Sequence, residues 1–336
     1  MNIYIAIPRF ALSGGNLVSL ELAKHLESVG FNVYCHSGFS VKKVNDVSLC
    51  PPIRGKINTL LNLLSFVFLS CYSLFCKNYI ATHHLTSLFN VVKRSRFALV
   101  QDVEVDFYPT KVKVIGGVLW KNYLNSRNLI FTNRVLAKKI GDPDFELVKG
   151  FSFVPFAFSN LRGEAVSNDV VTVIRDGLYK DPVKTLSVVN ELRTLNVNVI
   201  ALNASRQVID DVSVIKNVSR DEFIRTLMKS RLFVCLSKWE GLGLPNIEAY
   251  ISGCRVVTTE IPSSLMIKEL NPGAVHIVDS DLAPHEIAKI IRELISENSG
   301  AGASHEEVNI RNKQVCSCHE QWLEYARNVV VRGACL

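Results

Sequence analysis

The pattern of apolar residues divides the chain into short buried strands and amphipathic helices that alternate along its length. Ile3–Pro8 is an apolar, β-branched run; a glycine turn, a helix with apolar residues every three to four positions and a second strand at Phe31–Tyr34 follow it. Strand, turn, helix and strand in this order make a βαβ unit with parallel strands. Further strands are predicted at Tyr79–Thr82, Phe97–Val100 and Leu129–Thr132. The first part of the chain therefore predicts a doubly wound parallel sheet.

A second sheet of the same kind is predicted in the second half of the chain. Val170–Ile174 is its first strand, and amphipathic helices alternate with apolar strands from there to Ile295. A polar stretch that contains Gly163 separates the two halves. We therefore expect a first domain over residues 1–158, a linker over 159–169, a second domain over 170–304 and a final helical segment over 305–336.

The stretch Phe233–Val257 carries the most informative side chains. Its apolar strand ends at a Glu-Gly-Leu-Gly loop, Pro245 suits the first position of a helix, and Gly253 suits the helix end. The start of such a helix presents unpaired N–H groups and partial positive charge, which suit a phosphate. Glu240 and Glu248 frame this start, and carboxylates accept hydrogen bonds from sugar hydroxyls. The pattern indicates a nucleotide-sugar pocket or, more simply, a solvated Glu240 and a Glu248 that complements the helix dipole.

A family resemblance supports the nucleotide-sugar interpretation. Glu240 and Glu248, with seven residues between them and Gly-Leu-Gly-Leu-Pro after the first, resemble the E-x7-E signature of retaining GT-B glycosyltransferases, particularly the family 4 (group 1) enzymes of bacterial polysaccharide and lipopolysaccharide synthesis. The resemblance implies an α/β fold of two Rossmann-like, doubly wound domains that face a cleft, with the last segment crossing back to the first domain. It also implies that Glu240 binds hydroxyls of the donor sugar and Glu248 those of the ribose. The other donor-binding residues that it implies are Gly241, Leu242, Gly243, Leu244 and Asn246.

Two cations lie upstream of this motif. The strand Val170–Ile174 runs into Arg175, and Lys180 follows five residues later. The resemblance implies that this pair holds the diphosphate of the donor. A guanidinium fork and an ammonium would neutralise the charge of a leaving nucleoside diphosphate. The simpler alternative is a pair of ordinary surface cations.

Two glycines follow the first strand. Gly14 and Gly15 do not complete the G-x-G-x-x-G fingerprint, which argues against a nicotinamide enzyme. They resemble the Gly-Gly loop that family 4 enzymes place where the backbone approaches donor phosphate or acceptor. On their own they equally suit a tight turn.

His84 and Asp102 are candidates for the acceptor side. His84 follows the strand Tyr79–Thr82, at the edge of a parallel sheet where ligands bind, although adjacent histidines are often structural. Asp102 follows Phe97–Val100, at the end of the strand where many family members carry a histidine. It lies in a Q-D-x-E-x-x-F-Y-P stretch that resembles some rhamnan-type polysaccharide glycosyltransferases. With Glu240, Lys180 and Arg175, these two residues form the predicted catalytic set.

Positive charge is concentrated in the first half of the chain. Residues 1–158 contain 18 Lys and Arg against 9 Asp and Glu, a balance of +9, and the remainder has a balance of −2, which together give the net charge of +7. A basic half suits an anionic membrane face or an acidic acceptor, or is only a solvated face. We expect no nucleic-acid partner, because no recognised binding motif appears.

One uncharged segment has the length of a membrane span. Ile57–Cys76 contains 20 residues without a charge, but it includes several serines and asparagines and lies between strands of one predicted domain. We expect a buried or membrane-surface helix there. The N-terminus reads as a first strand, and no signal peptide is evident.

The pattern of cysteines argues against disulfides, and that of the acidic pairs argues against a metal site. The nine cysteines are scattered, which suggests reduced thiols in a cytoplasmic protein that lies, at most, at the inner face of the cell membrane. Asp142-Pro143-Asp144 and Asp279-Ser280-Asp281 have the spacing of a metal-binding pair but read as turns. We expect no metal and no cofactor beyond the nucleoside-diphosphate sugar substrate.

The predicted function is transfer of a sugar from a nucleoside-diphosphate sugar to a glycan or lipid-linked acceptor, with retention of configuration. In this scheme the second domain grips the nucleotide, the first domain presents the acceptor over Gly15, His84 and Asp102, and domain closure excludes water. Two alternatives remain. One is a sugar-nucleotide epimerase or phosphorylase of the same fold, and the other is a catalytically silent GT-B module that scaffolds a membrane-associated assembly.

Overall fold

The computed structural model describes residues 1–50, 56–155, 166–205, 214–216, 218–297 and 303–335. The chain divides into two compact units. The first unit comprises Met1–Val154 and Ser317–Leu336, and the second comprises Pro155–Cys316. The first unit thus ends four residues before the expected boundary at 158, and the final segment, expected to be separate, is divided between the units. Most of the linker predicted over 159–169 lies outside the described residues.

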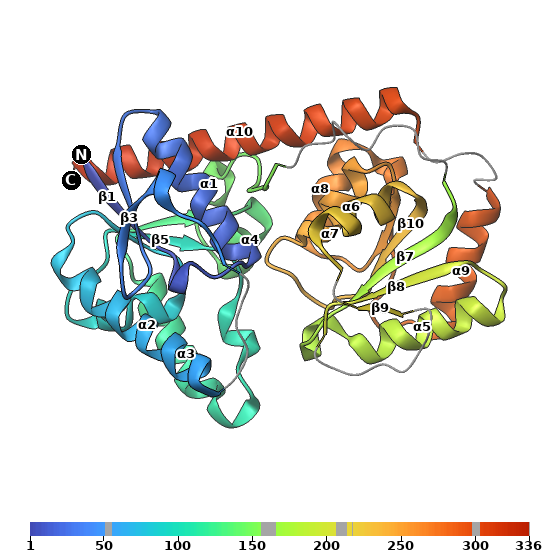
Figure 1. The fold of residues 1–336 in the computed structure, drawn as a ribbon, viewed down its shortest axis with the longest axis horizontal. Helices are drawn as coiled ribbons and strands as arrows, with labels where there is room; N and C mark the ends of the chain where they lie inside the picture. The colour runs from blue at the N-terminus through green and yellow to red at the C-terminus, as the bar shows by residue number, and fades with distance from the viewer. Residues whose placement is uncertain (51–55, 156–165, 206–213, 217, 298–302, 336) are drawn as a thin grey trace. The chain divides into compact units, whose positions relative to one another are not determined.

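The first unit is built on a six-stranded sheet in the order β3-β2-β1-β4-β5-β6 (Figure 1). All neighbouring strands are parallel except β2 and β3. The apolar runs form these strands because helices cover both faces of a parallel sheet, so that continuous Val, Ile and Leu are buried on each side. The strands are β1 (Asn2–Ala6), β2 (Asn32–His36), β3 (Val41–Lys43), β4 (Tyr79–Ala81), β5 (Phe97–Val100) and β6 (Asn128–Phe131).

Helices cover the two faces of the first sheet. Figure 1 shows α1 and the C-terminal half of α10 on one side and α2 and α3 on the other. The hydroxyl of Ser13 caps α1 by accepting the N–H of Asn16. The helices are α1 (Gly14–Ser28), α2 (Lys56–Phe75), α3 (Lys113–Leu124), α4 (Arg134–Ile140) and α10 (His305–Cys335).

The helix α2 buries several serines and exposes several large apolar side chains, which is unusual for a surface helix. Its buried side includes Ser65, Ser70 and Ser73, and the hydroxyls of the first two donate to the carbonyl oxygens of Ser37 and Leu85. Beside Thr59 and Asn62, its exposed side chains include seven large apolar ones: Ile57, Leu60, Leu63, Leu64, Val67, Phe68 and Phe75.

By length and composition α2 passes the test for a membrane span. Residues Ile57–Phe75 have a mean hydropathy of 1.6, although core helices of soluble proteins pass the same test. In a core helix most of the side chains are buried, whereas here only 22% of the apolar window is. The helix therefore lies on the unit rather than inside it.

The second unit contains a six-stranded, fully parallel sheet in the order β12-β11-β10-β7-β8-β9. In Figure 1, α6, α7 and α8 lie on one side of this sheet, and α5 and α9 pack together on the other. The strands are β7 (Asn168–Ile174), β8 (Val199–Asn203), β9 (Val214–Lys216), β10 (Ser230–Cys235), β11 (Arg255–Thr258) and β12 (Val275–Ile277). The helices are α5 (Pro182–Thr194), α6 (Arg220–Met228), α7 (Leu244–Ile251), α8 (Pro262–Leu270) and α9 (Pro284–Glu297).

The last helix belongs to both units. In its first half Arg311 donates to the carbonyl oxygens of Tyr250 and Cys254, each at 3.0 Å, within the second unit. In its second half Trp322 is fully buried in the core of the first unit and donates its indole N–H to the carbonyl oxygen of Phe131 at 2.9 Å.

Candidate active site

Two loops of the second unit meet at the point where the strand order of its sheet reverses. β7 begins the sheet, β8 and β9 extend it on one side, and β10, β11 and β12 extend it on the other. The carboxyl ends of β7 and β10 are therefore neighbours, with Arg175 directly after β7 and the loop that contains Glu240 after β10. In open α/β sheets ligands bind at the carboxyl ends of the strands at such a switch point.

Glu240 joins the two predicted cations. Its carboxylate contacts Arg175, with 2.5 Å between Nη2 and Oε1, and its other oxygen contacts the ammonium of Lys180. The same guanidinium nitrogen of Arg175 lies 3.4 Å from the hydroxyl of Ser237, which also follows β10. The structure thus brings together the three residues that the sequence predicted for the donor side, but as one ion-pair cluster instead of separate ligands.

The cluster determines the charge state of its members. Burial opposes ionisation of the Glu240 carboxyl, but the charges of Arg175 and Lys180 outweigh it and hold the pKa below its usual value. Burial likewise opposes the charge of Arg175, and Glu240 offsets this so that the guanidinium pKa is raised. Glu240 and Arg175 are therefore both ionised, and guanidinium and ammonium groups are strong hydrogen-bond donors to phosphate.

The start of α7 lies in the same loop. Gly243, the residue before α7, has a left-handed backbone with φ of +93°, and a Cβ there would lie 2.5 Å from the Ser263 hydroxyl oxygen. The carbonyl oxygen of Leu242 accepts the backbone N–H of Ser263 at 2.9 Å. Gly241 precedes Leu242 in the loop, and Leu244 is the first residue of α7. No side chain caps α7. Pro245 has no N–H and that of Asn246 donates to the carbonyl oxygen of Gly243 at 3.0 Å, so the helix start offers an anion mainly its partial positive charge.

Asn246 is a structural part of this helix start. It is fully buried, and its side-chain amide donates to the hydroxyls of Thr258 and Ser263, each at 3.1 Å. The Asn246 side chain therefore fastens the first turn of α7 to β11 and α8.

Glu248 is paired with a cation that the sequence did not indicate. The Arg220 guanidinium, at the start of α6, lies 2.7 Å from its carboxylate. Burial raises the pKa of Glu248 to about 6, although Arg220 acts in the opposite direction. Ser219 and Glu222 form a capping box that marks the start of α6 in the sequence. That signal locates Arg220 on a helix but does not show which residue it faces.

The glycines of the first unit lie at the start of α1, after β1. A Cβ at Gly15 would lie 3.1 Å from the side-chain oxygen of Gln101, which follows β5. The Gln101 amide donates to the carbonyl oxygen of Thr82 after β4, and the Thr82 hydroxyl donates to that of Ala6 in β1. These bonds join the carboxyl ends of three neighbouring strands, β1, β4 and β5.

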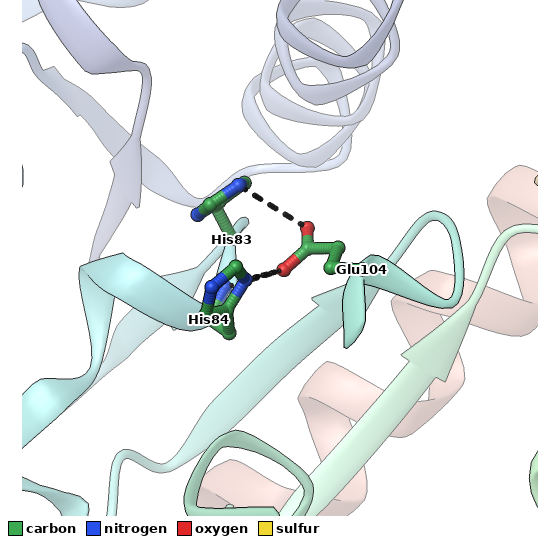
Figure 2. A group of neighbouring side chains, drawn as sticks. All are labelled: His83, His84 and Glu104. Carbon is green, nitrogen blue, oxygen red and sulfur yellow. Dashed lines mark hydrogen bonds and ion pairs between the residues drawn. The ribbon is translucent and has the colours of Figure 1, made fainter. Parts of the chain in front are cut away.

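His84 is the centre of a polar cluster at this edge of the first sheet (Figure 2). Its Nδ1 contacts the Glu104 carboxylate, whose same oxygen accepts the backbone N–H of His84 at 2.7 Å. Its Nε2 lies 2.5 Å from the Tyr108 hydroxyl oxygen. His83 lies beside this group, with its Nε2 at 3.9 Å from the other oxygen of Glu104. His84 and Glu104 are both buried.

Asp102 is not part of the His84 cluster. It is half-buried after β5, and its carboxylate accepts the backbone N–H of Val103 at 2.8 Å. The carboxylate beside His84 comes from Glu104, two residues further on, and Tyr108 completes the group. Glu104 and Tyr108 are both specified positions of the Q-D-x-E-x-x-F-Y-P pattern, so that pattern could have identified them as candidates.

The two Asp-x-Asp sequences form turns. The Asp142 carboxylate accepts the backbone N–H of Asp144, and the Asp279 carboxylate accepts that of Asp281, each at 2.8 Å. A carboxylate folded back on its own turn does not project from a strand end toward a substrate.

The eight cysteines whose side chains the structure describes are free thiols.

A family comparison agrees with the chemistry of the second unit. Residues 157–314, a little under half of the chain, match the family model for Glycosyl transferases group 1. This range contains the cluster of Arg175, Glu240 and Lys180, the Glu248–Arg220 pair and the start of α7. A search of curated proteins finds no significant match.

Solved structures show that the whole chain has the GT-B fold. A sucrose-phosphate synthase from Thermosynechococcus elongatus is similar at 13% identity and a TM-score of 0.63, over 98% of this chain and 97% of that one. HepE from Anabaena, in complex with UDP-glucose, has 12% identity and a TM-score of 0.63 over the full length of both chains. WaaG, a glycosyltransferase of lipopolysaccharide biosynthesis, has 12% identity and a TM-score of 0.62, over 98% of this chain and 94% of that one. The family match thus covers most of the second unit, and the solved structures extend the GT-B fold over the rest of the chain.

Proposed function

We propose that the protein transfers a sugar from a nucleoside-diphosphate sugar to a hydroxyl of a glycan or lipid-linked acceptor in the synthesis of a cell-surface polysaccharide. The observation that carries the proposal is the buried Arg175–Glu240–Lys180 cluster beside the uncapped start of α7, at the switch point of the second sheet. The group 1 match over the same residues and the GT-B fold support it.

The cluster suits the electrostatics of this reaction. When the bond between the sugar and the diphosphate breaks, negative charge grows on the leaving diphosphate. In this proposal Arg175 and Lys180, already oriented by Glu240, donate hydrogen bonds to it, and the α7 N-terminus adds its partial positive charge. Interactions that strengthen as this charge develops lower the barrier, because they favour the transition state over the bound substrate.

Glu240 and Glu248 hold the sugar portions in this proposal. One Glu240 oxygen contacts each cation, and an ionised carboxylate keeps lone pairs for hydroxyls of the donor sugar. Glu248, on α7, binds ribose hydroxyls, and Arg220 keeps its carboxylate directed by an ion pair. The reaction retains the anomeric configuration, as the E-x7-E resemblance implies; an NMR spectrum of the product in which the new linkage had the opposite anomeric configuration to the donor would refute this part.

Lys180→Ala and Glu240→Ala should each lower turnover by roughly 10²-fold or more, the scale found for electrostatic contacts to developing charge. The measurement is release of nucleoside diphosphate in the presence of acceptor extract. Lys268→Ala, an exposed lysine of α8, is the matched control and should act like the wild type. Since breaking a buried ion pair also destabilises a protein, melting temperatures are recorded beside the rates. Near-wild-type turnover in both site variants would reject the assignment.

No divalent metal is required in this proposal, because the two cations neutralise the diphosphate. Turnover in EDTA should equal turnover in magnesium or manganese. Activity that EDTA abolishes and manganese restores would contradict it.

An anionic membrane surface is the proposed partner of the first unit. The apolar residues exposed on α2 are joined by exposed Val114, Ile115 and Val118 on α3, and both helices contact the segment that follows His84. We call the exposed apolar residues of these two helices the α2–α3 face. Such a face on a soluble unit marks an interaction site. The chain has no acidic residue between Asp46 and Asp102, whereas Lys77, Lys93 and Arg94 are exposed there.

Basic charge around an apolar face matches an anionic bilayer. The serines of α2 fasten the helix to the unit, so we propose that it lies in the membrane interface instead of crossing the bilayer. This contact would hold the protein at the inner face of the cell membrane, where a lipid-linked acceptor is presented.

Co-sedimentation with vesicles tests the membrane contact. The wild type should bind phosphatidylcholine vesicles that contain phosphatidylglycerol, and more weakly in high salt. Leu63→Gln with Phe68→Gln should lower binding by at least about tenfold, since each side chain contributes roughly 1.5–3 kcal/mol when buried. Val183→Gln, which alters an exposed valine of α5 in the second unit, is the control. Equal binding of the wild type and the double variant would exclude the α2–α3 face.

A further inference from the structure

Three side chains of the first unit form a continuous chain of hydrogen bonds. Glu104, His84 and Tyr108 follow one another, with the histidine ring between the carboxylate and the phenol. Glu104 and His84 are buried, whereas Tyr108 is only half-buried. The chain therefore begins at a buried carboxylate and ends at a partly accessible hydroxyl.

The chain has a fixed direction. An ionised carboxylate can only accept hydrogen bonds, so the Nδ1 of His84 carries the ring hydrogen and donates it to Glu104. Whenever the ring is neutral, its Nε2 is an acceptor and the Tyr108 O–H is its donor. Among the described residues the Tyr108 hydroxyl makes no further hydrogen bond. Its oxygen thus offers lone pairs, and no hydrogen, to a ligand.

The surroundings keep Tyr108 in this state. Burial, with the Glu104 charge as a smaller cause, raises the pKa of Tyr108, so the phenol stays protonated. The ring lies against Gly116 of α3, where a Cβ would come within 2.6 Å of it. The absence of a side chain at Gly116 thus makes room for this tyrosine.

A metal ion is the main alternative occupant of the cluster. Donor atoms of His83, His84 and Glu104 lie within 4.8 Å of one another, as a metal site would need. However, the Nδ1 of His83 accepts the backbone N–H of Leu85 at 3.1 Å, which places the ring hydrogen on Nε2, the nitrogen that faces Glu104. A protonated nitrogen cannot bind a metal, and the His83 ring is held in place by stacking on Phe66. The remaining two ligands are fewer than the three or four of a zinc site.

We propose that the Tyr108 oxygen, oriented by His84 and Glu104, is a binding site for a hydroxyl group of the sugar acceptor. The inference rests on the proposed function for the identity of the ligand, and on the hydrogen-bond chain for the site. The cluster follows β4 and β5, next to the point between β1 and β4 where the order of the first sheet reverses. A site that only accepts selects an O–H donor, and sugar hydroxyls are such donors. Glu104 is a positioning residue, since it acts through His84.

The direction of the chain is measurable without a substrate. In the free protein, long-range ¹H–¹⁵N spectra of the histidine rings should show His84 with a protonated Nδ1 and an unprotonated Nε2, the signal being assigned from its loss in His84→Gln. In Glu104→Leu the Nδ1 loses its acceptor, so the share of the Nδ1-protonated tautomer should fall, whereas in Glu104→Gln an oxygen can still accept from Nδ1 and the wild-type tautomer should be kept. A protonated Nε2 in the folded wild type, or a tautomer unchanged in Glu104→Leu, would overturn the proposal.

The ligand is tested by titrating methyl glycosides of glucose, galactose, mannose and rhamnose in the absence of any donor. At least one should move the ring signals of His84. Its dissociation constant should rise by about fivefold to tenfold in Tyr108→Phe, the loss expected for one hydrogen bond. Tyr34→Phe, which removes a hydroxyl from β2, is the control and should bind as the wild type does.

Equal affinity in the wild type and Tyr108→Phe, or no response to any glycoside, would overturn the site. Because no nucleotide is present, the outcome of this binding experiment does not depend on whether the protein transfers a sugar. A protein that binds glycosides through Tyr108 but transfers no sugar would refute the proposed function and leave this site standing.

Discussion

Glu240 and Glu248 are both buried carboxylates, yet their pKa values move in opposite directions. Burial raises both, but Glu240 contacts two cations that lie largely inside the protein, whereas Glu248 contacts only Arg220, whose side chain is 37% exposed. A partly solvated guanidinium offsets less of the desolvation than two buried charges do. The same residue type at two ends of one motif therefore has two different protonation behaviours.

The raised pKa of Glu248 makes stability depend on pH. Its folded-state pKa of about 6 lies above the ordinary 4.5, so the folded protein binds this proton more tightly than the unfolded chain does. The contribution to stability, about 2 kcal/mol, is fully present below pH 4.5 and is lost as the pH rises through 6. Urea unfolding between pH 4 and 7.5 should show this loss in the wild type and not in Glu248→Gln. Parallel curves for the two proteins would contradict it.

The contacts between individual side chains were the part of the site that the sequence predicted least well. The family resemblance identified Glu240 and Glu248 by the E-x7-E spacing, and Arg175 and Lys180 by their own five-residue spacing after a strand, because each spacing is local in the sequence. Arg220 lies 28 residues from Glu248 in the sequence, and Glu104 lies 20 residues from His84. Contacts of this kind depend on which strand ends become neighbours in the sheet, and the sequence spacing alone does not specify that.

Among the elements, α7 depends most on a single backbone conformation. Gly243 and Gly30 both have left-handed backbones, with φ of +93° and +95°, but a Cβ would lie 2.5 Å from the Ser263 hydroxyl at Gly243 and meets nothing within 4 Å at Gly30. The two positions thus separate the cost of the conformation from the cost of the contact.

Gly30→Ala should lose about 1–2 kcal/mol of stability in the first unit, the cost of a left-handed alanine. Gly243→Ala should lose more in the second unit and should also weaken binding of UDP, GDP and dTDP, because Ser263 must move and Asn246 loses a partner. Hydrogen exchange of each unit and calorimetric titration with the three nucleotides measure both effects. Equal destabilisation and unchanged nucleotide binding would show that the Ser263 contact is unimportant.

The helix and strand pattern was largely predictable, whereas the orientation of the elements was not. Ile57–Cys76 was expected to be helical from its apolar content, and α2 occupies that range. Its serines nevertheless face inward, since they find carbonyl partners in Ser37 and Leu85. Partners that lie outside the helix cannot be read from its own periodicity.

At the scale of the whole molecule, α10 contributes to the stability of both units, through different residues in each. Trp322→Ala should destabilise the first unit by roughly 3–5 kcal/mol, as loss of a fully buried aromatic side chain does. Arg311→Ala leaves the carbonyl oxygens of Tyr250 and Cys254 without this partner and should destabilise the second unit. Hydrogen exchange, followed by mass spectrometry on peptides of each unit, should assign the two effects to different units. Faster exchange spread equally over both units in either variant would contradict this.

The division of α10 has a consequence for how the protein is made. Trp322, Ala326 and Val330 are core residues of the first unit, yet they are translated after the second unit. While the ribosome is still adding the second unit, the N-terminal sheet exposes the apolar strip that these three side chains later cover. A nascent chain in this state is a client for chaperones, and ribosomes stalled before codon 317 would release a product whose first half is prone to aggregate.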